Sequence, residues 1–493
     1  MTGRKKGGAV AAGHEMTVKA ARYALEEGGN ATDAACAAAW MACVVEPVLA
    51  SPGGGGFAMV AEDGETPQLC DFFAQTPKRA NPDADFRAIE ADFGTATQTF
   101  HIGPGSTATP GFVPGLFALH ERHGRLPMAR LIAPAAAIAR SGHAVNTFQA
   151  RLARIIAPIL LASEETRALF APSGDLPAEG ETLINPDLAG FLEGLADGGL
   201  DRYMTEAVPR MLAMQHGRGH LDREDFETYA PEWRTPLQET AGDGRVWLNP
   251  PPAASGVMIA LANREAERMA EENGACAPCD WAAALDSADR ARRECGHDPD
   301  ALAARLGPPS TRGTTHISVI DADGGACSLT VSNGEGNGHM VPGLGFMPNN
   351  MLGEEDVNPA GRSGWPTDTR LSSMMAPTVA RHGNGTLHVL GSGGSNRIRS
   401  VIFLVLRRLM AGGRPLAAAV EAPRLHVENG HLDFEPGFSA EEAKALAERF
   451  PDHRAWDARS MFFGGCHAVS RHPDGELEAH GDPRRDGAAD VMQ

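Results

Sequence analysis

Residues 314–320 constrain the fold of this chain more than any other stretch of similar length. They alternate in character, so the strand they predict carries the hydroxyls of Thr314 and Ser318, with a histidine between them, on one face. A turn signal, Asp-Ala-Asp-Gly at 321–324, follows, and residues 327–331 return as a second strand. The stretch therefore predicts a β-hairpin that begins at Thr314.

Helices and further strands are predicted on both sides of this hairpin. Periodicity, caps and Gly or Pro stops predict helices over 14–27, 31–45, 286–294 and 398–410, a mostly helical stretch over 109–229, and strands over 57–60, 68–73 and 386–390. The helix 31–45 is apolar nearly all round, and Asn30 and Asp33 have capping-box spacing at its start, which indicates a buried helix. Strands and helices in both portions favour a layered α/β arrangement.

The charge balance excludes some partners. The 493 residues contain 44 Lys and Arg against 63 Asp and Glu, a formal charge of −19, which would repel a phosphate backbone and anionic lipid. No stretch approaches the length that spans a bilayer, and residues 1–20 become polar too soon for a secretory signal. We therefore expect no nucleic-acid or membrane partner and a cytoplasmic protein.

The eight cysteines lack the regular spacing of a disulfide scaffold, which favours a reducing compartment. Cys276 and Cys279 have Cys-x-x-Cys spacing, and Cys295 and His297 could complete a zinc site. Because no thioredoxin-like unit surrounds the pair, structural or incidental cysteines are the favoured interpretation, with zinc as an alternative. No cofactor or metal is predicted.

Thr314 is also a candidate nucleophile, because it directly follows Gly313 behind a Pro- and Gly-rich run. A threonine hydroxyl is a weak nucleophile until a base accepts its proton, and a chain-terminal threonine can use its own α-amine. That amine has a pKa near 8 in model compounds, which suits a general base at neutral pH. Cleavage after Gly313 would create such a residue. Thr-Thr is also common at strand starts, so the pair alone decides nothing.

A glycine-rich segment downstream could bind the oxyanion that forms when a nucleophile attacks a carbonyl. Acyl transfer needs backbone N–H groups aimed at a developing oxyanion, and consecutive glycines let the backbone approach closely. Gly393 and Gly394, between a predicted strand and a predicted helix, are the candidates. The four glycines 53–56 lack the Gly-Lys-Ser/Thr of a phosphate loop, so close backbone packing is the favoured interpretation there.

Six motifs in this order resemble the gamma-glutamyltransferase family of N-terminal-nucleophile hydrolases. They are Gly-Gly-Asn-Ala-Thr-Asp-Ala-Ala through Val-Val-Glu-Pro at 28–47, Gly-Gly-Gly-Gly-Phe at 53–57, Thr-Thr-His-Ile-Ser-Val-Ile-Asp at 314–321, Asn-Asn-Met-Leu at 349–352, Arg-Leu-Ser-Ser-Met at 370–374 and Gly-Gly-Ser at 393–395. The resemblance implies a four-layer αββα sandwich, shared by a fragment 1–313 that contains a helical lobe over roughly 109–307 and a fragment 314–493. It also implies that these fragments form a heterodimer, with a dimer of heterodimers as a further possibility.

The resemblance also implies roles in catalysis. Thr314 would be the nucleophile and, in the precursor, the residue that cuts the Gly313–Thr314 bond. Gly393 and Gly394 would form the oxyanion hole. Ser332 would hydrogen-bond the nucleophile and its amine. Water or an amine would accept the acyl group.

The residues implied to bind substrate include two departures from the family pattern. Ser372 and Ser373 match family positions that hold the acyl part of the substrate, and Asn333, allowing a one-residue gap, matches an asparagine that contacts the substrate. Where the family has an arginine for the α-carboxylate of a γ-glutamyl group, this chain has Phe73, which offers no donor. Where the family has an aspartate for the ammonium, this chain has Glu354. An amine-bearing acyl group therefore stays plausible, whereas a free α-carboxylate would need another donor, for which Gln75, Lys78, Arg79 and Arg397 are candidates.

The sequence thus predicts a self-processing amidohydrolase or acyltransferase that acts on a small amide of a γ-glutamyl or related amine-bearing acyl group. Two alternatives stay open at this point. One is a family member with altered specificity, for a non-glutamyl amide or for a C–C bond in specialised metabolism. The other is an uncleaved, non-catalytic homologue.

Overall fold

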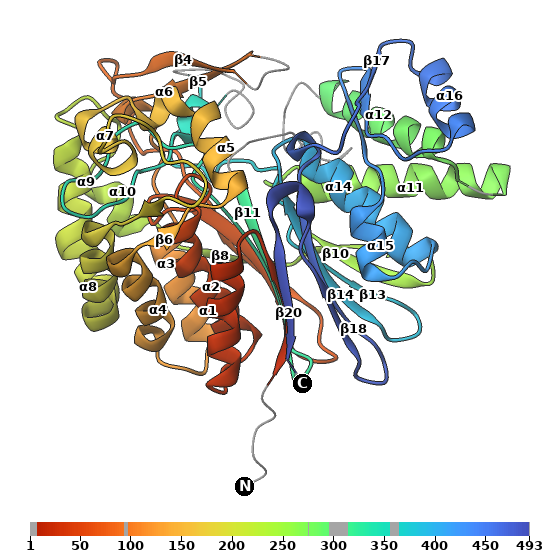
Figure 1. Ribbon diagram of the computed structural model, residues 1–493, viewed down its shortest axis with the longest axis horizontal. Coiled ribbons are helices and arrows are strands. Elements are labelled where there is room, and N and C mark those ends of the chain that lie inside the picture. Colours follow the sequence, from red (N-terminus) through yellow and green to blue (C-terminus); the bar gives the residue numbers. More distant parts are fainter. Residues whose placement is uncertain (1–6, 93–96, 275, 295–313, 355–363, 493) are drawn as a thin grey trace, which may run out of the picture.

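Two β-sheets stand face to face in the middle of the molecule, with helices on both outer sides (Figure 1). The computed structural model describes residues 7–92, 97–274, 276–294, 314–354 and 364–492. All strand pairings within the two sheets are antiparallel. The four-layer αββα sandwich expected from the sequence is confirmed.

The first sheet interleaves strands from distant parts of the chain. Its order is β20 (Ala488–Met492), β1 (Gly8–Ala12), β11 (Thr314–Asp321), β12 (Ala326–Ser332), β2 (Gly55–Ala61), β3 (Gln68–Phe72) and β8 (Glu232–Arg234). The predicted hairpin is its centre, with β11 and β12 paired from Thr314 opposite Ser332 to Ile320 opposite Ala326.

The second sheet has the order β19 (Leu477–His480), β18 (Gly465–Arg471), β14 (Leu387–Gly393), β13 (Thr378–Arg381), β10 (Gly244–Leu248) and β9 (Leu237–Ala241). The strand predicted over 386–390 extends to Gly393, which makes Gly393 the last residue of β14 rather than part of a turn. An apolar core that includes Phe57, Met59 and Val389 fills the space between the sheets.

Helices cover the outer face of the first sheet. They include α1 (Glu15–Glu26), α2 (Ala31–Val45), α3 (Phe112–His123), α4 (Met128–Ser141) and α8 (Pro186–Arg202). Helix α2 is buried along its whole length, as its apolar sequence predicted, and begins with the expected capping box between Asn30 and Asp33. Each large apolar side chain buried in this way contributes about 1.5–3 kcal/mol to folding.

The second sheet has its own outer layer, consisting of α11 (Ser255–Asn273), α12 (Pro278–Glu294), α14 (Arg397–Leu406), α15 (Leu416–Glu421) and α16 (Ala440–Arg449). The helix predicted over 398–410 continues past α14 as a π-helical turn, Arg407–Ala411.

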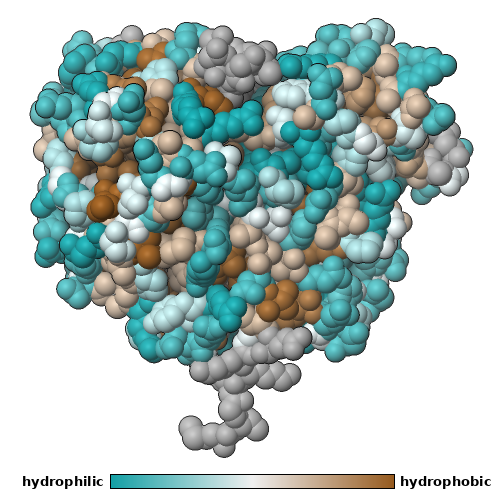
Figure 2. All heavy atoms as spheres, in the orientation of Figure 1, coloured by the Kyte–Doolittle hydropathy of each residue, from teal (hydrophilic) through white to brown (hydrophobic). Residues whose placement is uncertain are grey.

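Smaller elements complete the described chain. The remaining helices are α5 (Thr147–Ile155), α6 (Ala157–Leu160), α7 (Glu164–Phe170), α9 (Val208–Met214) and α10 (Arg223–Thr228), and the remaining strands are β4 (Arg87–Asp92), β5 (Thr97–Ile102), β6 (His143–Ala144), β7 (Thr182–Leu183), β15 (Leu425–Glu428), β16 (His431–Phe434) and β17 (His453–Ala455). The face drawn in Figure 2 is mostly hydrophilic, with apolar residues in small groups. Within the described residues, no helix combines the length and the apolar character required to cross a bilayer.

The two sheets come into direct contact where polar residues of β11 meet β14. The imidazole of His316, on β11, is 0% exposed and hydrogen-bonds Thr330 Oγ1 and Ser318 Oγ, each at 2.8 Å. A side chain on Gly391 would overlap this imidazole. A buried polar ring that is fully hydrogen-bonded cannot shift without losing those bonds, so the sheet spacing here depends on a glycine.

We expect Gly391→Ala to lower the free energy of unfolding by about 1–3 kcal/mol, because the added methyl overpacks the sheet interface. The measurement is the thermal unfolding midpoint. Gly190→Ala is the matched control, since Gly190 lies inside α8 with no atom near its missing side chain and an alanine there should be neutral or stabilising. Equal midpoints for Gly391→Ala and the wild type would contradict this account of the interface.

Candidate active site

Thr314 lies at the start of β11 and faces the space between the sheets. His316 and Ser318 share its face of the strand, and both contact the second sheet: a side chain on Gly391 would overlap His316, and Ser318 Oγ donates to His467 O at 3.0 Å. Alternation along the strand therefore directs the Thr314 side chain toward the second sheet as well. Thr314 is 2% exposed.

The glycine pair lies directly against Thr314. A side chain on Gly393 would overlap the carbonyl oxygen of Thr314, and Gly394 has φ 124°, a conformation that favours glycine. A methyl on Gly394 would also lie 2.7 Å from the Cα of Gly464. Helix α14 begins at Arg397, three residues later, so backbone N–H groups of a helix start are close by. This arrangement can stabilise a negative charge next to Thr314.

Ser332 and Asn333 end the strand that pairs with β11. Ser332 is the registered partner of Thr314, and its Oγ accepts from Gly334 N at 3.1 Å. Asn333 is buried, and its Nδ2 donates to Met347 O at 3.1 Å. The structure thus brings Ser332 beside Thr314 through the β ladder.

Glu354 lies next to this loop. It is 6% exposed, and a side chain on Gly334 would overlap its Oε1. The glycine after Asn333 therefore leaves room for the carboxylate, which is positioned close to the strand end that carries Ser332. An acidic group here can accept hydrogen bonds from an ammonium.

Ser372 and Ser373 are held by the turn that precedes α11. Ser372 Oγ donates to Pro252 O at 2.7 Å, and the carbonyl of Ser373 accepts from Ala254 N at 2.8 Å. The adjoining Leu371 N donates to Ala74 O at 3.0 Å, so the serine pair lies near the end of β3.

Comparisons with known proteins identify the family. The family model described as gamma-glutamyltranspeptidase matches residues 17–273 and 280–492. This chain belongs to the gamma-glutamyltranspeptidase family. The glutathione hydrolase proenzyme of Pseudomonas aeruginosa is 30% identical over 99% of this chain and 95% of that protein. The acylase ACY 1 proenzyme of a Pseudomonas species is 27% identical over 97% of this chain and 92% of that protein. In fold, the crystal structure of a cephalosporin acylase from Bacillus halodurans is similar, with a TM-score of 0.81, 23% identity and coverage of 99% and 96%.

Phe73, the residue expected from the sequence to replace the family's arginine, has apolar surroundings. Phe73 is 0% exposed, and its ring stacks on Phe57 with centroids 5.4 Å apart. A methyl on Gly55 would lie 3.0 Å from the Phe73 Cα, and Gly55 pairs with Ser332, which pairs with Thr314. Phe73 thus lies level with Thr314, in the same row of residues across the strands of the first sheet. Its ring belongs to the apolar core between the sheets.

The proposed substitutes for the missing arginine have other partners. Gln75 Nε2 donates to Asp368 Oδ1 at 2.7 Å, Lys78 Nζ lies 3.2 Å from Asp368 Oδ2, and Arg79 pairs with Asp222. Arg397 Nε donates to Phe462 O at 3.0 Å, and its guanidinium stacks on that ring. Arg397, at the start of α14, is the member of this set that lies nearest in sequence to the glycine pair.

Glu46, which belongs to the Val-Val-Glu-Pro motif, is a buried carboxyl group whose role the sequence did not indicate. It is 0% exposed and accepts from Thr315 Oγ1 at 2.7 Å and from Thr17 Oγ1 at 2.9 Å. The bond to Thr315 ties the start of β11 to the helical layer, so Glu46 positions the strand that begins at Thr314. Burial raises the pKa of Glu46 to about 7.

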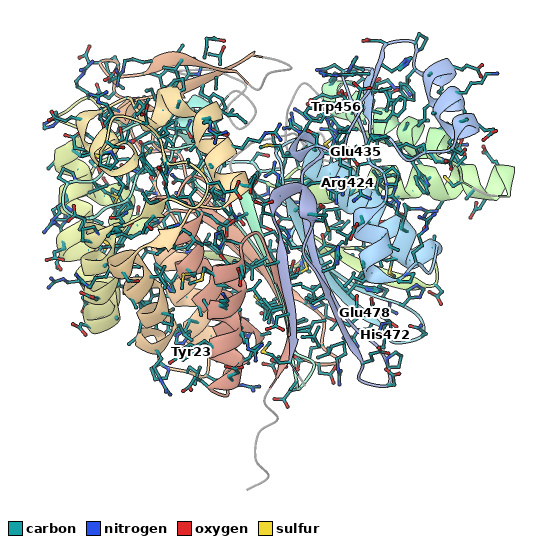
Figure 3. The ribbon with its side chains drawn as sticks, viewed as in Figure 1. Tyr23, Arg424, Glu435, Trp456, His472 and Glu478 are labelled. Carbon is teal, nitrogen blue, oxygen red and sulfur yellow. The ribbon has the colours of Figure 1, made fainter. Side chains whose placement is uncertain are left out.

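A buried ionic network that the sequence did not indicate supports the glycine pair from behind. Arg424 pairs with Asp482 and donates to Phe463 O at 3.0 Å and Gly464 O at 3.1 Å. Arg484 donates to Glu435 Oε2 at 2.6 Å. Figure 3 labels Arg424 and Glu435, which lie close together on the α14 side. Since Gly464 packs on Gly394, the network fixes the backbone behind the candidate oxyanion site.

The other sequence candidates have structural surroundings. A side chain on Gly54 or Gly56 would overlap a carbonyl of β12, so these glycines do provide close backbone packing. Cys276 and Cys279 are free thiols, and the described residues contain no cluster of three potential metal ligands. Cys295, His297 and Gly313 lie outside the described residues.

The raised pKa of Glu46 predicts a pH-dependent loss of stability. The folded protein holds this proton more tightly than the unfolded chain, so stability is highest below the unfolded pKa of 4.5 and falls as the pH rises through about 7. A shift of this size corresponds to about 3 kcal/mol. The free energy of unfolding, measured with urea between pH 5 and pH 9, should fall with pH in the wild type. In Glu46→Gln this decrease should be absent. The same pH dependence in both proteins would contradict the prediction.

Proposed function

We propose that the precursor cuts its own Gly313–Thr314 bond and that the mature protein cleaves amides through an acyl-enzyme on Thr314. The chain is an enzyme of the gamma-glutamyltranspeptidase family, and the uncleaved scaffold hypothesis is set aside. The observation that carries the assignment to Thr314 is its position at the start of β11, directly against the backbone of Gly393.

Self-cleavage forms an ester before it forms two chains. Thr314 Oγ attacks the carbonyl carbon of Gly313, and the proton of the hydroxyl passes to the departing nitrogen of Thr314. Water then hydrolyses the ester, which leaves a carboxylate on Gly313, a free hydroxyl and a free α-amine on Thr314.

Turnover uses the new amine as the base. It accepts the hydroxyl proton while Oγ attacks the scissile carbonyl, and the oxyanion accepts hydrogen bonds from the backbone at Gly393 and Gly394. The proton is then given to the leaving amine. Water, or a second amine, attacks the acyl-threonine, and the same α-amine removes its proton.

The two fragments, 1–313 and 314–493, would stay associated after cleavage. In the first sheet, β1, β2, β3 and β8 come from the first fragment, and β11, β12 and β20 from the second. In the second sheet, β9 and β10 come from the first fragment. Separating the fragments would break ladders in both sheets and expose their cores, so a heterodimer is the stable product.

The acyl pocket fits an acyl group that carries an amine without a free α-carboxylate. Glu354 supplies a carboxylate for an ammonium, and Ser332, Asn333, Ser372 and Ser373 supply hydroxyl and amide groups. Phe73 supplies an apolar wall, against which a carboxylate would lose its hydration without gaining a donor. Acylases among the relatives by name support specificities other than γ-glutamyl.

A reducing, cytoplasmic location is part of the proposal. The seven cysteines that the structure describes are free thiols, and five of them are buried. A secreted protein would be expected to pair at least some of its cysteines.

We expect Thr314→Ala to stay a single chain and to lack amidase activity, because it has no hydroxyl to attack either carbonyl. Thr314→Ser is the matched control, since serine keeps the hydroxyl and should still be cleaved. Denaturing electrophoresis and a chromogenic amide assay measure the two properties. Cleavage of Thr314→Ala into the same two fragments would rule out Thr314 as the self-cleaving residue.

The role of Phe73 predicts a gain of function. We expect Phe73→Arg to raise kcat/KM for γ-glutamyl 4-nitroanilide by about tenfold or more, since an arginine can pair with the α-carboxylate. Phe73→Leu should not raise it, and thermal unfolding of both variants controls for the cost of placing a charge beside Phe57. If the wild type hydrolyses this anilide as fast as Phe73→Arg does, the inference about the acyl group is wrong.

A further inference from the structure

A cavity of about 550 Å³ lies in the outer layer of the second sheet, among the ends of several helices. Its lining comes from α11, from the start of α12, from the π-helical turn after α14 and from α16. These helices lie together on the right of Figure 1. The volume falls within the range of small-molecule sites in proteins, and a ligand of nucleotide size would fit.

The cavity is separate from the candidate active site. Helix α14 begins at Arg397, three residues after Gly394, and the π-helical turn that continues it ends at Ala411, which lines the cavity. At about 1.5 Å per residue, this continuous helical segment places the cavity roughly 20 Å from the glycine pair. A small ligand in the cavity would therefore not contact Thr314.

The lining of the cavity carries an excess of positive charge. Arg407 and Arg408 come from the π-helical turn, and Arg414 comes from the loop that follows it. The carboxylate of Glu442 also lines the cavity, but it is engaged in capping α16, where its Oε2 accepts from Ser439 N at 2.8 Å. In a chain whose formal charge is −19, this is a local concentration of cations.

Arg408 is a buried member of this set with an open donor. It is 3% exposed, and its Nη2 donates to Pro423 O. Within the described part of the chain, its buried Nη1 has no hydrogen-bond partner. Glu435 attracts the guanidinium, but that carboxylate already binds Arg484. The charge of Arg408 is thus left without a carboxylate of its own among the residues that the structure describes.

A buried guanidinium in this state is costly. Burial, together with the neighbouring Arg424 and Arg414, lowers the pKa of Arg408 to about 9. Other buried arginines of the described chain are compensated, as Arg399 is by Asp289 at 2.9 Å. An anion in the cavity would offset the cost of burying Arg408, so the cavity favours an anionic ligand.

Arg407 adds a second open donor beside the first. It is 8% exposed, and its Nη1 donates to Asn263 Oδ1 at 3.2 Å and lies 3.5 Å from Glu267 Oε1. Its buried Nε has no hydrogen-bond partner among the residues described. Neighbouring guanidiniums with open donors match the three oxygens and the nearly double charge of a phosphate monoester.

The rest of the lining is suited to the organic part of such a ligand. The rings of Trp281 and Phe438 line the cavity, and both side chains are partly exposed. The Arg408 guanidinium lies 5.5 Å from the centroid of the Trp281 ring, so the charged and the aromatic parts of the lining are adjacent. Aromatic side chains pack well against another ring. A phosphate at Arg408 would therefore bring an attached ring to Trp281.

We propose that this cavity binds a phosphate monoester of an aromatic compound, such as a nucleotide. The phosphate lies at Arg408 and Arg407, and the ring packs against Trp281 and Phe438. This second site does not depend on the assignment of Thr314 as the nucleophile.

Calorimetric titration of the protein with 1-naphthyl phosphate and with adenosine 5′-monophosphate tests the inference. At least one of the two should bind with a Kd below about 1 mM. The matched ring compounds without phosphate, 1-naphthol and adenosine, should bind about tenfold more weakly or less, because they lose the charge-assisted hydrogen bonds. Inorganic phosphate should also bind more weakly than the better probe, because it lacks the ring.

Arg408→Met should weaken binding of the better probe by about tenfold or more, since methionine fills the space of the stem and removes the charge. Replacing an unpaired buried charge by an apolar side chain is expected to be neutral or stabilising, and the thermal unfolding midpoint checks this. Arg264→Met is the matched control. It removes the same charge from an exposed arginine of α11 that pairs with Glu239, and it should bind as the wild type does.

Three results would overturn the inference. One is a wild type to which neither aromatic phosphate binds, which requires no variant. Another is inorganic phosphate, or a ring compound without phosphate, that binds as tightly as the better probe, since this would leave one half of the lining without a role. The third is unchanged binding in a folded Arg408→Met, which would place the phosphate elsewhere on the protein.

Discussion

The close approach of the two sheets at Thr314 and Gly393 is the constraint on which the rest of the structure depends. Neither Gly391 nor Gly393 can carry a side chain, because each faces an atom of β11. Packed sheets normally keep about 10 Å between them, filled by side chains. Here glycines remove the side chains of one sheet, so the main chain of β14 can reach the hydroxyl-bearing end of β11. A reactive hydroxyl and a row of backbone donors thereby meet inside a rigid core.

Buried charges behind this point compensate one another. Arg424, Asp482, Arg484 and Glu435 form a network that holds the loop behind Gly394. Because each guanidinium there has a carboxylate, the network positions backbone without attracting further anions.

Much of the fold could be predicted from local patterns. Helix α2 was predicted with its exact bounds, because an all-apolar stretch between a capping box and a proline has few other interpretations. The hairpin from Thr314 was predicted from alternation and an Asp-Gly turn. The order of strands in the two sheets could not be predicted in this way, because the pairings of β1 with β11 and of β10 with β13 join residues far apart in sequence. Likewise, motifs pointed to Thr314 and the glycine pair, whereas the importance of Glu46 follows only from its burial and from its hydrogen bonds to Thr315 and Thr17.

Intact-mass analysis of catalytically active protein tests the central claim most directly. The account predicts two polypeptides, corresponding to residues 1–313 and 314–493, and Edman degradation of the smaller one should release threonine first, from a free α-amine. Activity in a preparation that contains only the uncleaved chain, or a small fragment that starts at another residue, would contradict the account.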